Sequence, residues 1–398
     1  MLFWPSTARM KRSGPTLINE RPRLKADMKA EQILITGGDG YTGLRLARKY
    51  LEETKDGVLL WVRASRADEF QAKKERLCRE LNSFHDRVNY AWGDLTDESP
   101  FEDIVPQEVK VIIHSAAVTR FNVDEETARK VNLEGTEKLL RFASRCESLE
   151  ALGLLSTVYA SGLRPGAIEE SALDLRDGFA NFYESSKWMA ENALRTEFSH
   201  LPWRVLRLAT INADDDRGHV TQYNAFHNTL KLIFYGLLSL IPGDPQTPLY
   251  FITGEFAADT IYALMKQSGN KLTYHVSHTA GESLTLGELI DVAFETFARD
   301  KDFESRRILK PLYSDAESFG LLTDAVNAFG GGVVNQALSS VTPFARQLFI
   351  HKKLQNQRLV SALGDYRAPD ARRLIRKTCE YLVRTKWGRY PESDAPES

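Results

Sequence analysis

The stretch that most limits the possible folds lies near the start of the chain, where an apolar run meets a glycine-rich turn. Residues 33–35 read Ile-Leu-Ile, glycines follow at positions 37, 40 and 43, and apolar residues then recur at helical spacing over 44–51. A strand, a glycine turn and a helix in this order predict a site where a pyrophosphate contacts backbone N–H groups at a helix N-terminus. An ordinary glycine-rich turn is the alternative.

Each glycine of this turn has an expected task. Gly37 makes the tight turn, Gly40 lets the backbone approach the phosphates, and Gly43 lets the helix pack on the strand. The other residues of the turn that we expect at the dinucleotide are Thr36, Tyr41 and Thr42.

The amino-acid composition sets only broad limits on the class of protein. The 398 residues carry a net charge of −2, which favours neither nucleic acid nor a membrane surface as a partner. The three cysteines, Cys78, Cys146 and Cys379, are widely spaced and odd in number. They fit neither a disulfide framework nor a metal site, so we expect free thiols in a reducing, cytoplasmic compartment and no metal.

The end of the second predicted strand bears on the choice of cofactor. Residues 58–62 are apolar and are followed by Arg63-Ala-Ser-Arg66, with Arg63 twenty residues past Gly43. An acidic residue there binds a free ribose 2′-hydroxyl, whereas an arginine pairs with a 2′-phosphate. Arg63 and Arg66 therefore favour NADPH over NADH, and a solvated strand-end arginine is the alternative.

Strands and helices then alternate along the chain. Strands are predicted over 88–95, 109–114 and 151–155, and helices over 67–84 and 124–146. This alternation predicts an α/β, Rossmann-type doubly wound parallel sheet, whose strand ends form the binding crevice. The residues expected there are Asp94, Leu95, Ser115, Ala116, Ala117 and Thr157.

A tyrosine and a lysine share a predicted helix face after the fifth strand. Tyr183 and Lys187 are four residues apart, and an ammonium beside a phenol lowers the phenol pKa toward working pH. The spacing alone is weak, because Tyr262 and Lys266 have it too. Tyr262 lies in a later helix with apolar neighbours, and we interpret it as a core or surface residue.

Together these motifs resemble the extended short-chain dehydrogenase/reductases over about residues 31–280. The matching residues are Gly37-x-x-Gly40-x-x-Gly43, Gly93-Asp94-Leu95, His114-Ser-Ala-Ala117, Asn132, Ser156-Thr157 and Tyr183-x-x-x-Lys187. Residues 62–64, 116–121, 156–162 and 182–187 look most like the thioester-reductase and fatty acyl-CoA reductase branch. The chain departs from that branch after Arg207, where a proline is usual and Leu208 stands, and at Asp214-Asp-Asp216.

The resemblance implies NADPH-dependent reduction of an acyl thioester to an aldehyde, and in some members onward to an alcohol. The acyl group would be carried by coenzyme A or by an acyl carrier protein. Thr157 and Tyr183 would hydrogen-bond the oxyanion, Tyr183 would deliver the proton, and Lys187 would lower the phenol pKa and hold the nicotinamide ribose. Asn132 would support the cofactor side.

The later part of the chain is predicted to bind the substrate. Residues 222–241 hold an apolar helical stretch, and the apolar run at its end, 230–241, is too short to span a bilayer. Core helix, wall of an acyl cleft and membrane-facing flap are the open interpretations. Residues 369–385 predict a basic amphipathic helix. The simplest interpretation is that its basic face is solvated, and the alternative is that this face binds a phosphate of coenzyme A or of a carrier protein. The expected substrate contacts are Val118, Phe121, Tyr159, Phe234 and Leu237.

We therefore expect four segments. Residues 1–29 are a disordered basic tail, or lie upstream of a start at Met28, with weak contact to an anionic surface as the alternative. Residues 30–217 form the NADP-binding domain, and 218–390 form a mostly helical substrate region partly interleaved with the sheet. A glycine run at 330–332 predicts a hinge, and 391–398 a disordered tail.

Two other functions remain open from the sequence. One is a different short-chain activity, such as a sterol- or sugar-nucleotide-type oxidoreductase or epimerase, which would use the same Tyr183 and Lys187. The other is a non-catalytic nucleotide-binding scaffold, which the presence of Thr157, Tyr183 and Lys187 disfavours. The acyl chain and the oligomeric state are not encoded in any motif.

Overall fold

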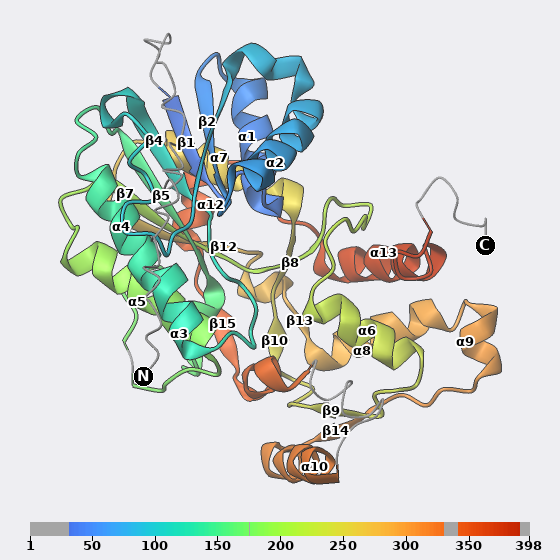
Figure 1. Cartoon of the computed structure of the whole chain (residues 1–398). Coiled ribbons are helices and arrows are strands. Elements are labelled where there is room, and N and C mark those ends of the chain that lie inside the picture. Colours follow the sequence, from blue (N-terminus) through green and yellow to red (C-terminus); the bar gives the residue numbers. More distant parts are fainter. Residues whose placement is uncertain (1–31, 175, 330–340, 391–398) are drawn as a thin grey trace, which may run out of the picture.

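The computed structural model describes residues 32–174, 176–329 and 341–390 and centres on a seven-stranded parallel sheet (Figure 1). The strand order is β12-β7-β5-β4-β1-β2-β3, and every neighbouring pair is parallel. The strands are β1 (Gln32–Thr36), β2 (Gly57–Arg63), β3 (Val88–Gly93), β4 (Val109–His114), β5 (Ala151–Thr157), β7 (Trp203–Leu208) and β12 (Leu272–Val276). The predicted doubly wound α/β fold is confirmed.

Helices cover both faces of the sheet because successive strand residues point to opposite sides. Ile33 packs in one cluster with Leu46 of α1 and Ile261 of α7, whereas Leu34 packs in another with Leu139 of α4 and Leu194 of α5. The covering helices are α1 (Tyr41–Glu53), α2 (Ala67–Glu80), α4 (Gly135–Ala143), α5 (Phe182–Thr196), α7 (Gly254–Lys266) and α12 (Gln357–Leu363). Both faces are therefore buried, as parallel sheets require.

The predicted helix over 124–146 is one helical rod with an irregular middle. It begins with α3 (Glu125–Ala128), passes through a π-helical segment at Arg129–Glu134 and continues as α4. Asp124 caps its start by accepting a hydrogen bond from the Thr127 backbone. The π-helical segment carries Asn132, and such irregular turns are frequent at functional sites.

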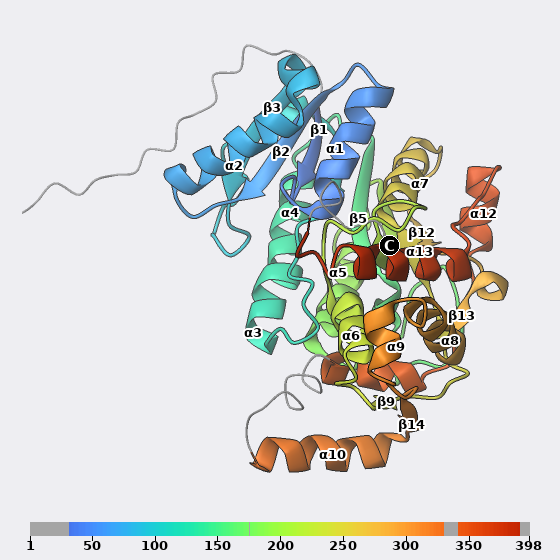
Figure 2. The same ribbon diagram turned by 90° about the vertical axis from the view of Figure 1, so that its right-hand side faces the viewer.

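A second lobe packs below the sheet layers. Its core joins α6 (Ala225–Phe234), α8 (Leu286–Phe297) and α13 (Ala371–Arg384). Its other elements are β8 (Thr210–Ala213), β9 (Leu240–Pro242), β10 (Pro248–Leu249), β11 (Phe251–Thr253), β13 (Leu284–Thr285), α9 (Lys301–Ser305), β14 (Leu312–Ser314) and α10 (Ala316–Phe329). Figure 2 shows α10 set apart from the other helices at the end of this lobe.

The two parts are interleaved along the chain. Helix α7 and strand β12 come from the predicted substrate region and complete the sheet layers. Strand β15 (Lys352–Leu354) pairs with β6 (Gly166–Ile168), which joins the C-terminal part of the chain to the segment before α5.

The predicted helical stretch at 222–241 is wrong in its second half. Helix α6 ends at Phe234, Gly236 adopts a positive φ of 69°, and residues 240–242 form β9. A glycine in this left-handed conformation ends the helix, because other residues adopt it only with strain. The predicted tails at 1–29 and 391–398 and the glycine hinge at 330–332 lie outside the described residues.

A buried ion pair fastens α5 to the sheet. Arg207 on β7 is fully buried and donates to both carboxylate oxygens of Glu191, at 2.7 to 3.2 Å. Its other N–H groups donate to the backbone carbonyls of Glu169 and Ser171. Arg207, at the position where the resembled branch usually has an Arg-Pro pair, is therefore buried in the structure and does not line the cavity.

Arg207→Met should lower the free energy of unfolding by about 3–5 kcal/mol, because it leaves the buried Glu191 carboxylate with only the longer contact to Arg195 at 3.8 Å. Urea denaturation measures this loss. Arg367→Ala is the control, since that arginine pairs with Asp365 at the surface and should change stability by less than about 0.5 kcal/mol. Equal small losses for both variants would contradict this account.

Candidate active site

A cavity of about 1010 Å³ lies at the carboxyl ends of the central strands, between the sheet and the second lobe. The glycine turn after β1 and the ends of β4 and β5 form one part of its wall. Elements of the second lobe form the rest, including α6, α8 and the segment 341–354. The crevice predicted from strand alternation therefore exists, and it continues into the region that the sequence predicted to bind the substrate.

The glycine turn has the close packing that a dinucleotide site needs. Gly37 has a φ of 68°, and a Cβ atom added to Gly43 would lie 2.2 Å from the Gly37 carbonyl oxygen. Any side chain at 43 would push helix α1 away from the strand. The predicted cofactor residues that line the cavity are Gly37, Gly40, Tyr41, Thr42, Arg63, Asp94, Leu95, Ser115, Ala116, Ala117 and Lys187.

Two other predicted cofactor residues lie behind the cavity wall and support it. The buried Thr36 hydroxyl hydrogen-bonds the His114 ring nitrogen at 2.7 Å and accepts from the Ala116 backbone N–H. Asn132 accepts from the backbone N–H of Val118 at 2.8 Å and donates to its carbonyl at 2.9 Å. Both therefore shape the loop after β4 and do not themselves line the cavity.

Gly43 and Arg66 also lie off the cavity. Gly43 packs on the Gly37 carbonyl, as described above, and Arg66 pairs with Asp68 with its side chain 73% exposed. The prediction that Arg66 contacts the cofactor is not supported by this placement. Arg63 does line the cavity, where its Nε donates to Asp94 at 2.8 Å.

Lys73 is a second basic residue at this end of the cavity, and the sequence did not single it out. It lines the cavity from α2, donates to the Arg63 backbone carbonyl and pairs with Asp39 at 3.4 Å. A lysine two turns into a charged helix carries no sequence signal of its own.

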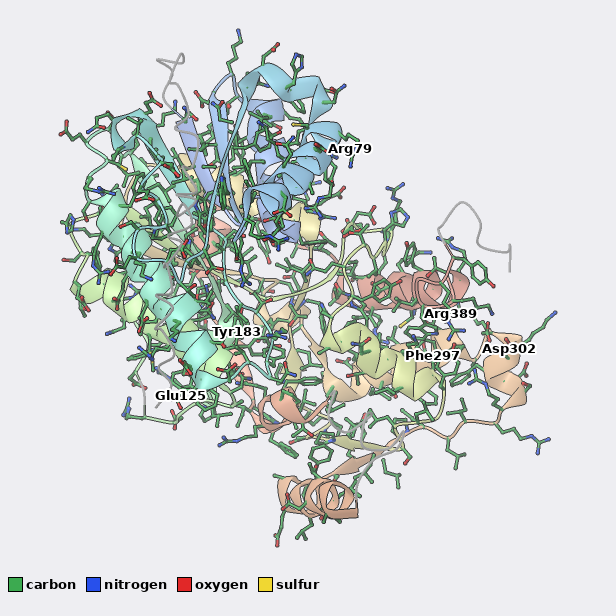
Figure 3. All side chains as sticks on the ribbon, in the orientation of Figure 1. Arg79, Glu125, Tyr183, Phe297, Asp302 and Arg389 are labelled. Carbon is green, nitrogen blue, oxygen red and sulfur yellow. The ribbon has the colours of Figure 1, made fainter. Side chains whose placement is uncertain are left out.

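The three predicted catalytic residues meet in the middle of the cavity, and Figure 3 marks Tyr183 where the sheet layers meet the second lobe. Asn181 caps α5 and so fixes the first turn, which carries Tyr183. Tyr183 and Thr157 both line the cavity, and burial raises the phenol pKa well above its ordinary value, an effect that the Thr157 side chain partly offsets. Tyr183 is therefore protonated at neutral pH and available as an acid.

Lys187 does not act on Tyr183 as predicted. Its ammonium donates to the Leu155 backbone carbonyl at 2.6 Å, and burial lowers its pKa to about 8. The prediction that Lys187 lowers the phenol pKa is wrong for the chain alone, because desolvation of the phenol dominates. The lysine–phenol hydrogen bond occurs instead at the other pair, where Lys266 donates to Tyr262 at 3.1 Å.

Aromatic side chains lie beside Tyr183 in the cavity wall. The predicted substrate residues Val118, Phe121 and Tyr159 line the cavity, and the Phe121 ring lies 5.7 Å from the rings of both Tyr159 and Tyr183. Phe344 lies 6.1 Å from Phe121 and comes from a segment that the sequence left without a role.

Phe234 and Leu237, the other two predicted substrate residues, do not line the cavity. Phe234 packs against Phe297 and Trp387 at 5.2 and 5.5 Å, and Leu237 is 42% exposed. Their neighbours do line it. The apolar wall on this side consists of Leu230, Ile233, Leu238, Ile241, Leu286, Leu289 and Ile290.

Asp214 is a supporting residue of the glycine turn. Its carboxylate accepts hydrogen bonds from the Tyr41 hydroxyl and from Arg45, both at 2.6 Å. The acidic run that departs from the expected motif thus has a structural task at the cofactor end of the cavity.

Residues 35–261 match the family model described as male sterility protein, an NAD-binding family. This match covers more than half of the chain, so the chain belongs to that family. The family match and the relatives described next place the chain in the thioester-reductase and fatty acyl-CoA reductase-like branch of that family.

The individual proteins that resemble the chain share less than a third of its residues over the matched regions. A fatty acyl-CoA reductase of Drosophila melanogaster is 22% identical over 59% of this chain and 54% of its own length. A carboxylic acid reductase of Segniliparus rugosus is 29% identical over 53% of this chain, which spans 20% of that protein. The terminal R domain of the myxalamid biosynthetic pathway has the same fold, with a TM-score of 0.71, 20% identity and coverage of 91% of this chain and 93% of the domain.

The described residues contain no group of three or more His, Cys, Asp or Glu side chains placed to hold a metal ion. No helix among them has both the length and the apolar character needed to cross a bilayer.

The lowered pKa of Lys187 predicts a specific pH dependence of stability. Its pKa is about 8 in the folded protein and 10.5 in its ordinary environment, so between these values the unfolded chain binds more protons. This group therefore makes the free energy of unfolding rise as pH increases from 8 to 10.

Lys187→Met should flatten that rise relative to the wild type. Urea denaturation at pH 7, 8, 9 and 10 measures it, with Lys266→Met as the control for a lysine at the same spacing from a tyrosine. If the free energy of unfolding changes with pH in the same way in wild type and in Lys187→Met, Lys187 is not a buried lysine with a lowered pKa.

Proposed function

We propose that the protein is an NADPH-dependent reductase that converts an acyl thioester, on coenzyme A or on a carrier-protein arm, to an aldehyde. One observation carries the proposal. Thr157 and Tyr183 both line a cavity that is continuous from the glycine turn to an apolar wall. The names of the relatives, a fatty acyl-CoA reductase and a carboxylic acid reductase, support the same substrate class.

The residues around the cavity give the proposed mechanism. The nicotinamide, when bound, supplies the hydride to the thioester carbonyl. Thr157 and Tyr183 both donate to the oxygen on which negative charge develops, and such preorganised donors stabilise a transition state most strongly. Tyr183, whose phenol is neutral and protonated at neutral pH, then delivers its proton to that oxygen.

Lys187 and the loop after β4 complete the arrangement. Lys187 lines the cavity one helical turn from Tyr183, where it would hold the nicotinamide ribose. Collapse of the resulting hemithioacetal releases the thiol and leaves the aldehyde. Phe121 and Tyr159 keep water from the reacting carbon because their rings cover the Tyr183 side of the cavity.

Tyr183→Phe should lower turnover by about 100-fold or more, since it removes the proton donor and keeps the ring. The assay is steady-state NADPH oxidation with a series of acyl thioesters, with circular dichroism and cofactor titration to show that the variant is folded and binds cofactor. Tyr262→Phe is the matched control at the same spacing from a lysine, and it should stay within a few-fold of wild type. Near-normal turnover of Tyr183→Phe would refute the proposed mechanism.

The preference for NADPH rests on two basic side chains, Arg63 and Lys73, at the same end of the cavity. Arg63 is 70% exposed, so its guanidinium can leave Asp94 for a 2′-phosphate at small desolvation cost. Arg63→Ala should weaken NADPH binding by about 1.5–3 kcal/mol, the range for a hydrogen bond to a charged group, and barely change NADH binding.

Fluorescence titration with both cofactors measures this difference. Arg66→Ala is the control, because Arg66 follows in sequence but lies off the cavity. Equal losses of NADPH and NADH affinity in Arg63→Ala would show that the arginine does not select the phosphate.

The apolar wall predicts a dependence on acyl chain length. Leu238 lines the cavity and is 5% exposed, whereas the adjacent Leu237 lies outside it. Leu238→Ala should lower kcat/KM for long acyl chains by about tenfold and leave short ones nearly unchanged, since burying a leucine contributes roughly 1.5–3 kcal/mol. Leu237→Ala should alter neither, and a uniform loss across chain lengths in Leu238→Ala would indicate core damage instead.

A further inference from the structure

Two buried ionisable side chains beside the site have no part in the mechanism above. Glu184 is completely buried and directly follows Tyr183, and Lys352 is 7% exposed and lines the cavity from β15. Burial lowers the pKa of Lys352 and raises that of Glu184, while each charge favours the ionised form of the other.

Gln347 connects the two charges. Its amide N–H groups donate to the Glu184 carboxylate at 2.8 Å and to the Gly162 carbonyl at 3.0 Å, and its oxygen accepts from the Lys352 ammonium at 2.8 Å. Lys352 also donates to the Gly162 carbonyl at 2.5 Å. We name these four residues, Glu184, Gln347, Lys352 and Gly162, the clamp.

The clamp joins both catalytic segments to the second lobe. Gly162 ends the short turn that begins directly after Thr157, and Glu184 lies in the first turn of α5 beside Tyr183. Gln347 and Lys352 belong to the segment 341–354, which forms a wall of the cavity. The Lys352 ammonium also lies 5.9 Å from the centre of the Tyr159 ring.

Stability alone is a poor reason for such a network. Two buried charges lose hydration that their mutual attraction repays only in part, so apolar replacements of a buried pair are often as stable. Directional hydrogen bonds instead fix the relative positions of the groups that they join. Here they can fix Thr157 relative to Tyr183, two residues that lie on separate elements and must both reach one substrate oxygen.

We propose that Lys352 is a positioning residue that, through Gly162, Gln347 and Glu184, fixes Thr157 and Tyr183 relative to each other. The inference rests on the proposed function, because it assigns the clamp to the same reaction. It follows that docking of the segment 341–354 completes the catalytic pair, while the cofactor end of the cavity, on the glycine turn, forms independently.

Lys352→Met keeps most of the side-chain length and removes the ammonium. The full-length variant should lose kcat by about tenfold or more, because small misplacements of catalytic groups are costly, and should bind NADPH within twofold of wild type. Lys353→Met is the matched control, since Lys353 is the exposed neighbour on the same strand, and its kinetics should not change. Lys352→Arg retains charge and donors and should recover most of kcat.

Hydrogen–deuterium exchange tests the positioning without any substrate. The Gly162 and Leu163 amides donate to the Tyr159 and Gly178 carbonyls, and in Lys352→Met their exchange should be at least tenfold faster than in wild type and in Lys353→Met. If Lys352→Met does not fold, Gln347→Met breaks the same clamp and is measured in its place.

The outcomes separate the two claims. Unchanged exchange over 159–163, or a kcat within threefold of wild type on a substrate that wild type reduces, overturns the positioning role. If wild type reduces no acyl thioester, the proposed function fails, and the exchange measurement still decides whether Lys352 holds the catalytic segments in place.

Discussion

All seven strands of the central sheet run parallel, and their carboxyl ends therefore meet at one edge. The register places Thr36 of β1 beside His114 of β4, and His114 beside Leu154 of β5. Three loops that are far apart in the sequence, after residues 36, 114 and 157, thus open onto one cavity. The proposed cofactor site depends on that convergence, because a dinucleotide can extend from one strand end to the next only if the ends are adjacent.

Buried polar contacts convert this edge into a site of defined shape. His114 hydrogen-bonds Thr36 on one side and Thr136 on the other, and Asn132 fixes the backbone at Val118. On the catalytic side, Glu191 accepts from Ser156 and from Arg207, which ties α5 to β5 and β7. The residues that line the cavity are held by a layer of paired polar groups, as precise binding geometry requires.

The sequence predicted the sheet, the glycine turn and the Thr157–Tyr183–Lys187 group because each depends on local patterns of fixed spacing. It did not predict Lys73, Asp214 or the segment 341–354, since their positions follow from long-range packing that no local pattern records. Phe234 and Leu237 illustrate the limit. An apolar stretch identified the right part of the chain, but the end of α6 at Phe234 and the turn at Gly236 decide which side chains of that stretch face the cavity. Likewise, spacing alone could not show that burial, rather than Lys187, has the largest effect on the pKa of the Tyr183 phenol.

The most direct test of the central claim follows atoms from cofactor to product. The full chain would be incubated with NADPH deuterated at the transferring position and an acyl thioester, and aldehyde, free thiol and oxidised cofactor would be quantified together. The account predicts one thiol and one oxidised cofactor for each aldehyde, with deuterium at the aldehyde carbon. Thioester left intact while the protein instead oxidises an alcohol with NAD, or epimerises a sugar nucleotide without net cofactor use, would contradict it.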